Sequence, residues 1–185
     1  MTQKIPAIDI SSTFGGPSPA RDQANGEIMA AATGTGFMTV TGLPHDMLSP
    51  DIRKRMLSIF DLPQDSKQRL YRHNFDPSRP NVYRGWFPLQ PGLTTYKEGI
   101  DLGPDIAHGA GRVEPGDPLT EATPLPTEHE LPGWHDAVID YYRNMEATGR
   151  ALMQSVARGL QLEETIFDDV FSRGISTLRL LHYPV

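Results

Sequence analysis

The hydrophobic and polar positions near the N-terminus predict a strand, a helix and a second strand. Apolar and polar residues alternate through IPAIDI as in a short strand, and GFMTVTG has the pattern of another strand between glycines. Between them, apolar residues recur at helical spacing, at Ala20, Ala24, Ile28 and Ala31. Gly34 is expected to end this helix, because glycine is the usual residue at helix C-termini.

Two Ser-Pro pairs predict where helices begin. Ser18 and Ser49 are candidate N-caps, because a serine oxygen can accept a hydrogen bond from a backbone N–H of the first turn. Pro19 and Pro50 suit the first helical position. The second helix would run through LSPDIRKRMLSIFDLP, end before Pro63 and present one apolar face, made of Ile52, Met56 and Ile59.

The middle of the chain, Phe75–Gly133, carries most of the prolines and glycines and shows little sustained periodicity. Its NVYRGWFPL part is too hydrophobic for a free linker. Its later part, AHGAGRVEPGDPLTEATPLPTEHELPG, predicts a mobile surface loop.

The strongest helical pattern lies between Trp134 and Gly159, where apolar residues form a stripe at helical spacing. A shorter helix, EETIFDDVF, is expected next, and Ser176–Tyr183 predicts a final β-strand. One face of that strand would carry Leu178, Leu180 and His182, and the other Thr177, Arg179, Leu181 and Tyr183. The order of elements indicates an α+β fold.

Composition excludes several classes of function. The 185 residues carry a net charge of −6, which argues against a general nucleic-acid binder. No apolar stretch is long enough to span a bilayer, so we expect a cytoplasmic protein without membrane contact. Without cysteine, the chain can form neither disulfides nor thiolate metal sites.

The histidines do not form a recognisable metal site. An iron site built from two histidines and a carboxylate commonly has His and Asp two residues apart, and no histidine here is followed by a carboxylate at that spacing. His129 and His135 in EHELPGWHD are separated by Pro132 and Gly133, so one helix face cannot hold both. We expect a surface loop that caps a helix there. No Gly-x-Ser-x-Gly elbow is present either, so we assign neither catalytic residues nor metal ligands.

Two features suit ligand binding. In VYRGWF, Arg84 lies beside Tyr83 and Trp86, and its planar fork could bind a substrate carboxylate. The alternative is a structural arginine that stacks on Trp86 or pairs with Glu98. In the final strand, the Tyr183 hydroxyl could hydrogen-bond an anionic ligand, or the residue could pack at a sheet edge.

Five stretches in order resemble one known family. Three of them resemble the N-terminal domain of Fe(II)- and 2-oxoglutarate-dependent dioxygenases, in particular the isopenicillin N synthase-like family. These three stretches are KIPAIDIS, GFMTVTGLP and FDLPQDSKQRL. YRGWFPL with KEGIDLG resembles a segment beside the family's active site. STLRLLHYP resembles its Leu-Arg-Leu-x-x-Tyr-Pro strand, an early strand of the catalytic jelly roll.

The resemblance implies a domain layout. Residues 1–110 would form the dioxygenase N-terminal domain, 111–132 a Pro/Gly-rich loop and 133–174 the helices that back the sheet. Residues 175–185 would begin a double-stranded β-helix that is truncated in this chain, because in the family the iron ligands follow the Leu-Arg-Leu strand. Fe(II) and 2-oxoglutarate are therefore implied as cofactors, with their ligands expected beyond Val185.

The resemblance also implies roles for single residues. Tyr183 matches the tyrosine that approaches the co-substrate carboxylate, whereas Leu181 stands where many members have asparagine. Arg84 lies near a position from which some members contact a substrate carboxylate, with Tyr83 and Trp86 beside it. Arg179 is expected to support the sheet. Isopenicillin N synthase itself uses no 2-oxoglutarate, so use of this co-substrate is an inference.

Two functions remain. The first is the N-terminal part of an oxygenase that oxidises a C–H bond of a small molecule with O2 and converts 2-oxoglutarate to succinate; this part alone would be inactive. The second is a non-catalytic binding module that uses VYRGWF and the edge of the final strand. An uncovered apolar edge strand also predicts self-association.

Overall fold

The computed structural model describes residues 4–44, 48–74, 76, 78–90, 92, 96–109, 114–172 and 174–184. The chain divides into two compact units. Residues 1–47 and 143–173 form the first unit, and residues 48–142 and 174–185 form the second. Among the described residues, none of the helices has the length and apolar character required to cross a membrane.

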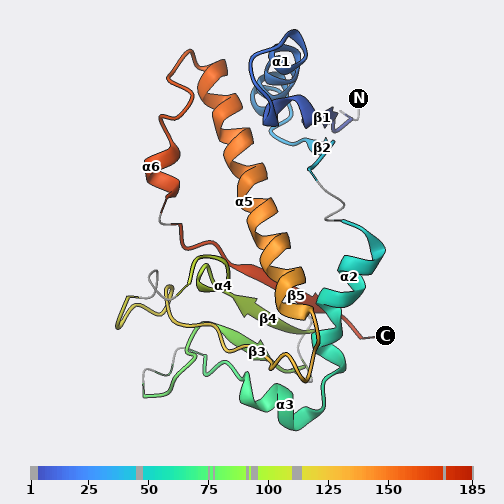
Figure 1. Ribbon diagram of the computed structural model, residues 1–185, viewed down its shortest axis with the longest axis vertical. Helices are drawn as coiled ribbons and strands as arrows, with labels where there is room; N and C mark the ends of the chain where they lie inside the picture. The colour runs from blue at the N-terminus through green and yellow to red at the C-terminus, as the bar shows by residue number, and fades with distance from the viewer. Residues whose placement is uncertain are drawn as a thin grey trace. The chain divides into compact units, whose positions relative to one another are not determined.

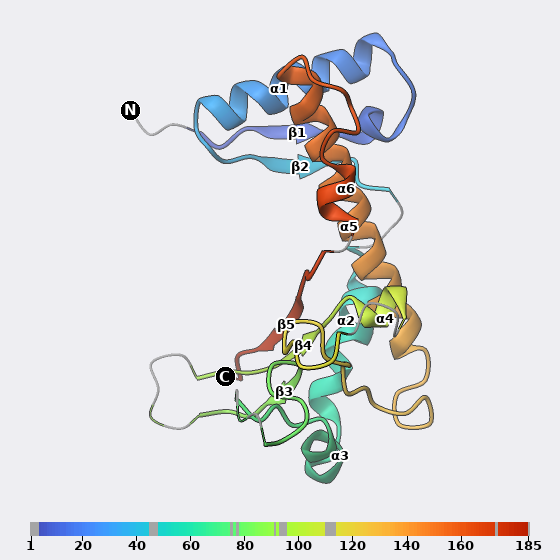
Figure 2. The ribbon, with the colours of Figure 1, turned by 90° about the vertical axis from the view of Figure 1, so that its left-hand side faces the viewer.

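The first unit contains the predicted strand, helix and strand. Strand β1 (Ala7–Asp9) pairs in parallel with β2 (Thr39–Thr41), and the 3-10 helix η1 (Ser11–Phe14) and helix α1 (Pro19–Thr33) connect them. Figure 2 shows α1 lying along the two strands. The Ser18 hydroxyl accepts a hydrogen bond from the backbone N–H of Arg21 at 3.2 Å, which confirms the predicted N-cap.

The core of the first unit is small and aliphatic. Ile8, Ile10, Ile28 and Ala31 are buried together, and Leu152 of helix α5 (Trp134–Gly159) packs against them. The bounds of α5 are those that the apolar stripe predicts. The shorter helix predicted from EETIFDDVF is reduced to α6 (Asp168–Phe171), because the residues before it form turns.

The second unit contains an antiparallel sheet, short helices before and after its strands, and the beginning of α5, up to Tyr142. Helix α2 (Pro50–Leu57) starts at the predicted Ser49 cap and continues into the 3-10 helix η2 (Ser58–Asp61) and helix α3 (Gln64–Arg69). The sheet has the order β3-β4-β5, where the strands are β3 (Gly85–Phe87), β4 (Glu98–Leu102) and β5 (Leu178–His182) (Figure 1). Helix α4 (Asp105–His108) follows β4.

The described parts of residues 75–133 are therefore more ordered than the sequence indicates. Strand β3 has only three residues, which is too short for a periodic pattern, and its partner strand is separated from it in the sequence. The predicted mobile loop is also held in place where the structure describes it. Thr120 and Thr123 are buried, and the Thr123 hydroxyl donates to Asp105 Oδ1 at 2.7 Å.

The register of the sheet places different chemistry on its two faces. Trp86, Ile100 and Leu180 stand opposite one another on the face that packs into the core. The other face carries Phe87, Gly99 and Leu181 in one row, and Asp101 and Arg179 in the next. The alternation predicted for the final strand is thus confirmed from Leu178 to His182.

At one end of the core face, Glu98 gathers three polar side chains. Its carboxylate accepts hydrogen bonds from Trp86 Nε1 at 3.0 Å, His182 Nδ1 at 2.9 Å and Lys67 Nζ at 3.2 Å. Burial raises the pKa of Glu98, but the hydrogen bonds from His182, Trp86 and Lys67 lower it more, so the net pKa lies below the ordinary value. The charged form of Glu98 therefore stabilises the fold.

We expect the Glu98→Gln substitution to lower the free energy of unfolding of the second unit by about 1–3 kcal/mol at pH 7, because buried donors lose a charged acceptor. The lowered pKa means that this contribution is present above the unfolded-state pKa of about 4.5 and is lost as the pH falls through the folded-state pKa. Both tryptophans lie in the second unit, so urea titrations followed by fluorescence report on it. Glu114→Gln, at an exposed position of the same unit, is the control. An equal loss at pH 7 and pH 3 would contradict the role of the charge.

Candidate functional site

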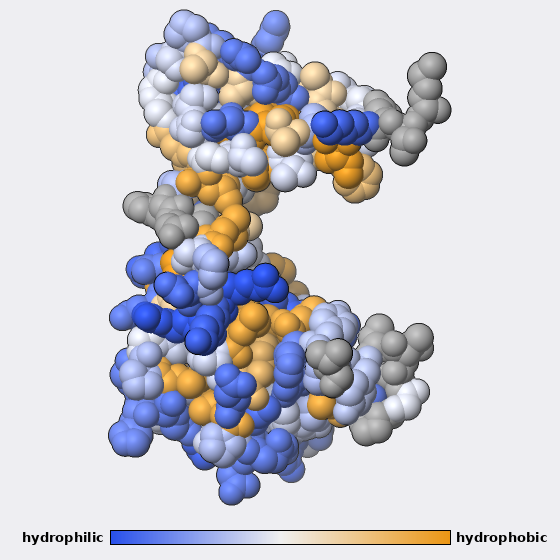
Figure 3. Space-filling view, turned by 90° about the vertical axis from the view of Figure 1, so that its right-hand side faces the viewer, coloured by the Kyte–Doolittle hydropathy of each residue, from blue (hydrophilic) through white to orange (hydrophobic). Residues whose placement is uncertain are grey.

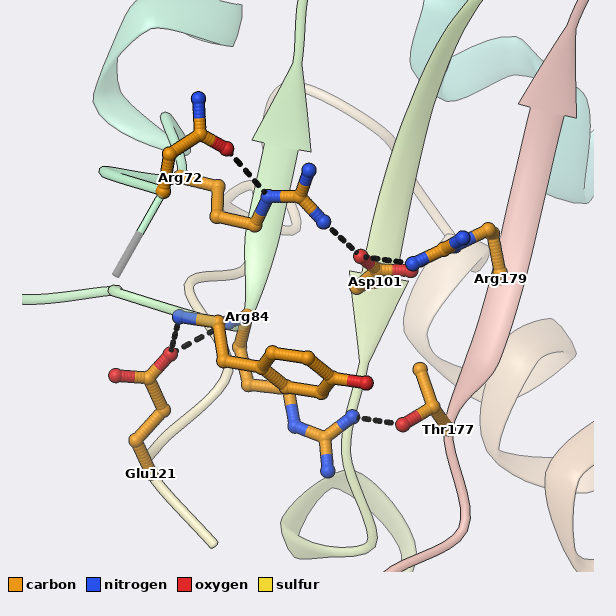
Figure 4. Close-up of polar contacts among 8 residues, drawn as sticks. Arg72, Arg84, Asp101, Glu121, Thr177 and Arg179 are labelled. Atoms are coloured by element: carbon orange, nitrogen blue, oxygen red, sulfur yellow. Dashed lines mark hydrogen bonds and ion pairs between the residues drawn. The ribbon is translucent and has the colours of Figure 1, made fainter. Parts of the chain in front are cut away.

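A buried carboxylate lies at the centre of the sheet face opposite the core. Asp101 of β4 is fully buried, and two arginines approach it from the two sides (Figure 4). Arg72 Nη1 lies 2.5 Å from Asp101 Oδ2, while Arg179 of β5 places Nε 2.5 Å from Oδ1 and Nη2 3.0 Å from Oδ2. Because one carboxylate cannot neutralise two guanidinium groups, this cluster carries a surplus positive charge.

The cluster borders a small pocket. Its volume is about 150 Å³, and its lining residues are Arg72, Phe87, Gln90, Lys97 and Arg179. The Arg179 side chain is 44% exposed, whereas Asp101 is fully buried, so the pocket presents the cations and hides the anion. Hydrogen bonds to Asp101 raise the pKa of Arg179 above its ordinary value, which keeps this guanidinium charged.

Phe87 forms the apolar side of the pocket and holds both guanidinium groups against its ring. The guanidinium carbons of Arg72 and Arg179 lie 4.5 Å and 5.7 Å from the ring centroid, within the range of cation–π attraction. This arrangement depends on Gly99, because a Cβ atom there would lie 2.4 Å from Phe87 Cζ. The glycine of KEGIDLG thus makes room for the aromatic ring.

Arg84, a predicted substrate-binding residue, is completely buried. Its Nη2 donates to the carbonyl oxygen of Leu119 at 2.6 Å, its Nη1 hydrogen-bonds Thr177 Oγ1, and its guanidinium lies 5.0 Å from the Tyr83 ring centroid (Figure 4). These contacts fit the structural alternative, although the partners are not the expected Trp86 and Glu98. A role of Arg84 in substrate binding stays a prediction.

The neighbours of Arg84 are also held within the unit. Glu121 accepts hydrogen bonds from the backbone N–H groups of Val82, Tyr83 and Arg84 at 3.0, 2.5 and 2.5 Å. Trp86 is 2% exposed and belongs to the core. The backbone approaches closely at Gly85, because a Cβ there would lie 2.4 Å from the carbonyl oxygen of Leu70.

Tyr183 follows β5 and is 57% exposed. Lys97 Nζ lies 5.9 Å from the centroid of its ring, so the tyrosine predicted to approach the co-substrate stands beside one lysine of the pocket. Its role in binding the co-substrate stays a prediction.

The sequence did not indicate the residues that line the pocket as ligand-binding residues. Asp101 was the available signal: a carboxylate between Ile100 and Leu102 in a strand is buried only when cations compensate it. The identity of those cations could not be inferred, because Arg72 and Arg179 are remote from Asp101 in the sequence.

No group of three or more His, Asp or Glu side chains suited to a metal ion occurs within the described part of the chain. At EHELPGWHD, His135 Nε2 lies 2.7 Å from the Pro126 carbonyl oxygen, and Glu130 accepts hydrogen bonds from the N–H and hydroxyl of Thr127. Hydrogen bonds from Ser66 and Thr127 lower the pKa of Glu130 to about 2. These contacts lie at the start of α5, where the sequence predicts a surface loop that caps a helix.

The chain is similar in sequence to known non-haem iron enzymes. Residues 5–127 match the family model described as the N-terminal region of non-haem dioxygenase in morphine synthesis. Isopenicillin N synthase of Streptomyces clavuligerus is 28% identical over 184 residues, which cover 97% of this chain and 55% of that protein. A 2-oxoglutarate-Fe(II) type oxidoreductase of Aspergillus fumigatus is 29% identical over 206 residues and 98% of the chain, again with 55% of its own length covered. This chain thus spans about half the length of these relatives.

The fold resembles that of a Neurospora crassa protein whose crystal structures are known in free and ligand-bound forms. The C-terminally truncated apo form has a TM-score of 0.73 at 25% identity, with 97% of this chain and 62% of that chain covered. The full-length form in complex with alpha-KG and 5-formyluracil has a TM-score of 0.71 at 25% identity, with 97% and 52% covered.

We expect Asp101→Asn to lower the free energy of unfolding of the second unit by about 3 kcal/mol, because loss of the buried carboxylate leaves two arginines uncompensated. Urea unfolding followed by tryptophan fluorescence measures the change. Asp61→Asn, at an exposed position of the same unit, should change the stability by less than about 0.5 kcal/mol. Equal effects of the two substitutions would show that the cluster does not stabilise the sheet.

Proposed function

Because this chain belongs to the non-haem dioxygenase N-terminal family, we propose that it forms the N-terminal part of a non-haem Fe(II)/2-oxoglutarate-dependent oxygenase. The reaction would be the oxidation of a C–H bond of a small molecule by O2, coupled to decarboxylation of 2-oxoglutarate to succinate. The observation that carries the proposal is the similarity to a 2-oxoglutarate-Fe(II) type oxidoreductase over 98% of the chain.

The relatives support both the reaction class and the kind of substrate. The Aspergillus fumigatus relative is a 2-oxoglutarate-Fe(II) type oxidoreductase, and the full-length Neurospora crassa structure contains alpha-KG together with 5-formyluracil. We therefore infer that Fe(II) and 2-oxoglutarate are the cofactors, and that the substrate is a small molecule. The cytoplasmic location, like the absence of nucleic-acid and membrane partners, stays a prediction.

The iron does not fit the described residues, which supply no set of metal ligands. We propose that its ligands lie outside this chain, as the resemblance to the Leu-Arg-Leu strand implies, and that the chain alone is inactive. The contribution of this chain would be the sheet face with Asp101 and Arg179, and the exposed Tyr183, which would approach the co-substrate.

The alternative is a non-catalytic binding module. One of its two predicted surfaces is weakened, because Arg84 and Trp86 of VYRGWF are buried. The other surface remains, since β5 lies at one edge of the sheet. Hydrophobic residues on the face shown in Figure 3 are interspersed with hydrophilic ones, as on ordinary protein surfaces. Self-association through β5 stays a prediction.

The proposal is tested by extending the chain. We expect the reading frame to continue past Val185 with a His-x-Asp pair, a distal histidine and an arginine. The extended protein should release succinate from 2-oxoglutarate in the presence of Fe(II) and O2, whereas residues 1–185 alone should release none above the protein-free background.

Two results would contradict this proposal. A stop codon directly after Val185 would favour the binding module. Succinate release by residues 1–185 alone, abolished by an iron chelator, would show that this chain contains its own iron ligands.

A further inference from the structure

We propose that the pocket lined by Arg72, Phe87, Gln90, Lys97 and Arg179 binds the carboxylate of the substrate, so that the oxygenase acts on an organic acid. This inference rests on the proposed function and deepens it. It names a substrate class and a binding site formed by residues that the sequence did not indicate as ligand-binding.

The pocket has more positive than negative charge. Three cations line it, and Asp101 is the carboxylate that pairs with two of them. Lys97 has no hydrogen bond or ion pair within the part of the chain that the structure describes; its contact is the ring of Tyr183. The pocket therefore holds about two uncompensated positive charges, which an anionic ligand would neutralise.

The two arginines of the pocket also keep N–H donors that are not used within the described part of the chain. Arg72 uses Nε for Asn74 Oδ1 at 3.3 Å and Nη1 for Asp101. Arg179 uses Nε and Nη2 for Asp101. Among the described residues, Arg72 Nη2 and Arg179 Nη1 make no hydrogen bond, so each guanidinium keeps N–H donors for a second carboxylate.

The arrangement of these donors is fixed before a ligand arrives. Asp101 is immobilised in the centre of the sheet, and both arginines are held by it and by the ring of Phe87. Their side-chain entropy is therefore lost on folding and not on binding, which favours affinity. A pair of free surface arginines would lack this advantage.

The size of the pocket limits what it can hold. About 150 Å³ accommodates a carboxylate and a few adjoining carbon atoms, but it lies below the range typical of complete ligand sites. The pocket would thus bind one end of the substrate, with Phe87 contacting the carbons next to the carboxylate and Gln90 at the rim.

The co-substrate 2-oxoglutarate also carries carboxylates, so two sources share this chemistry. We assign the pocket to the substrate because the family resemblance implies that the co-substrate ligands other than Tyr183 lie beyond Val185. The surplus positive charge beside Asp101 would then be available to the carboxylate of the substrate. The titration described next distinguishes the substrate from the co-substrate.

The test is a titration of the 185-residue chain with 3-phenylpropionate, with 3-phenylpropanol as the neutral analogue. The arginine Nε–H and Gly99 amide signals are followed by NMR. We expect saturable shifts at Arg72, Arg179 and Gly99 with the acid, and binding of the alcohol at least about tenfold weaker, because it lacks the charge-assisted hydrogen bonds.

Variants locate the binding in the pocket. Lys97→Gln leaves the Asp101 cluster intact and should weaken binding of 3-phenylpropionate about fivefold, and Arg179→Gln should weaken it about tenfold or more. Lys54→Gln, at an exposed position of α2, is the matched control and should bind like the unaltered chain. Circular dichroism verifies that each variant is folded.

The outcomes are distinct. Binding of the acid that depends on Lys97 and is not displaced by 2-oxoglutarate supports the inference. Displacement by 2-oxoglutarate, with Lys97→Gln weakening both ligands, would assign the pocket to the co-substrate and overturn the inference while leaving the proposed function intact. No saturable shifts, or equal affinity for acid and alcohol, would also overturn it. Failure of the proposed function would appear separately, as an absence of succinate release by the extended protein.

Discussion

The buried carboxylate of Asp101 is the constraint on which the second unit depends. A charge in the middle of a sheet is stable only when cations and hydrogen bonds replace its lost hydration. Arg72, from the segment after α3, and Arg179, from β5, supply both. The same ion pairs connect parts of the chain that are far apart in sequence, so formation of the sheet also assembles the pocket.

The sequence predicted those elements whose signals are local. Ser18 and Ser49 cap helices where Ser-Pro pairs stand, and the apolar stripe gave the bounds of α5. Strands β3 and β4 were missed because their stability comes from pairing with each other and with β5, which no short window contains. Proline and glycine content likewise indicated a mobile loop, whereas the hydrogen bonds of Glu121 and Thr123 anchor it through partners that are distant in the sequence.

The site shows the same limit for side chains. Arg84 and Arg179 are the same residue type, and the sequence favoured Arg84 as the ligand-binding residue. The structure uses Arg84 entirely within the unit and leaves Arg179 half-exposed. The strand alternation did place Arg179 on the correct face. What it could not supply was Asp101 opposite it, which turns a residue expected only to support the sheet into one wall of a pocket.

The cations of the pocket differ in how much the stability of the fold depends on them. Arg72 and Arg179 are committed to Asp101, so a change at either position alters the fold together with the charge of the pocket. Lys97 makes neither hydrogen bonds nor ion pairs with other described residues, so its charge can change at little cost to the sheet. The cluster around Asp101 thus forms a cationic site whose ion pairs the fold requires. The charge of residue 97 determines how strongly this site attracts an anion. If relatives of this chain act on substrates of different charge, the difference should be found at this position before it is found at Asp101.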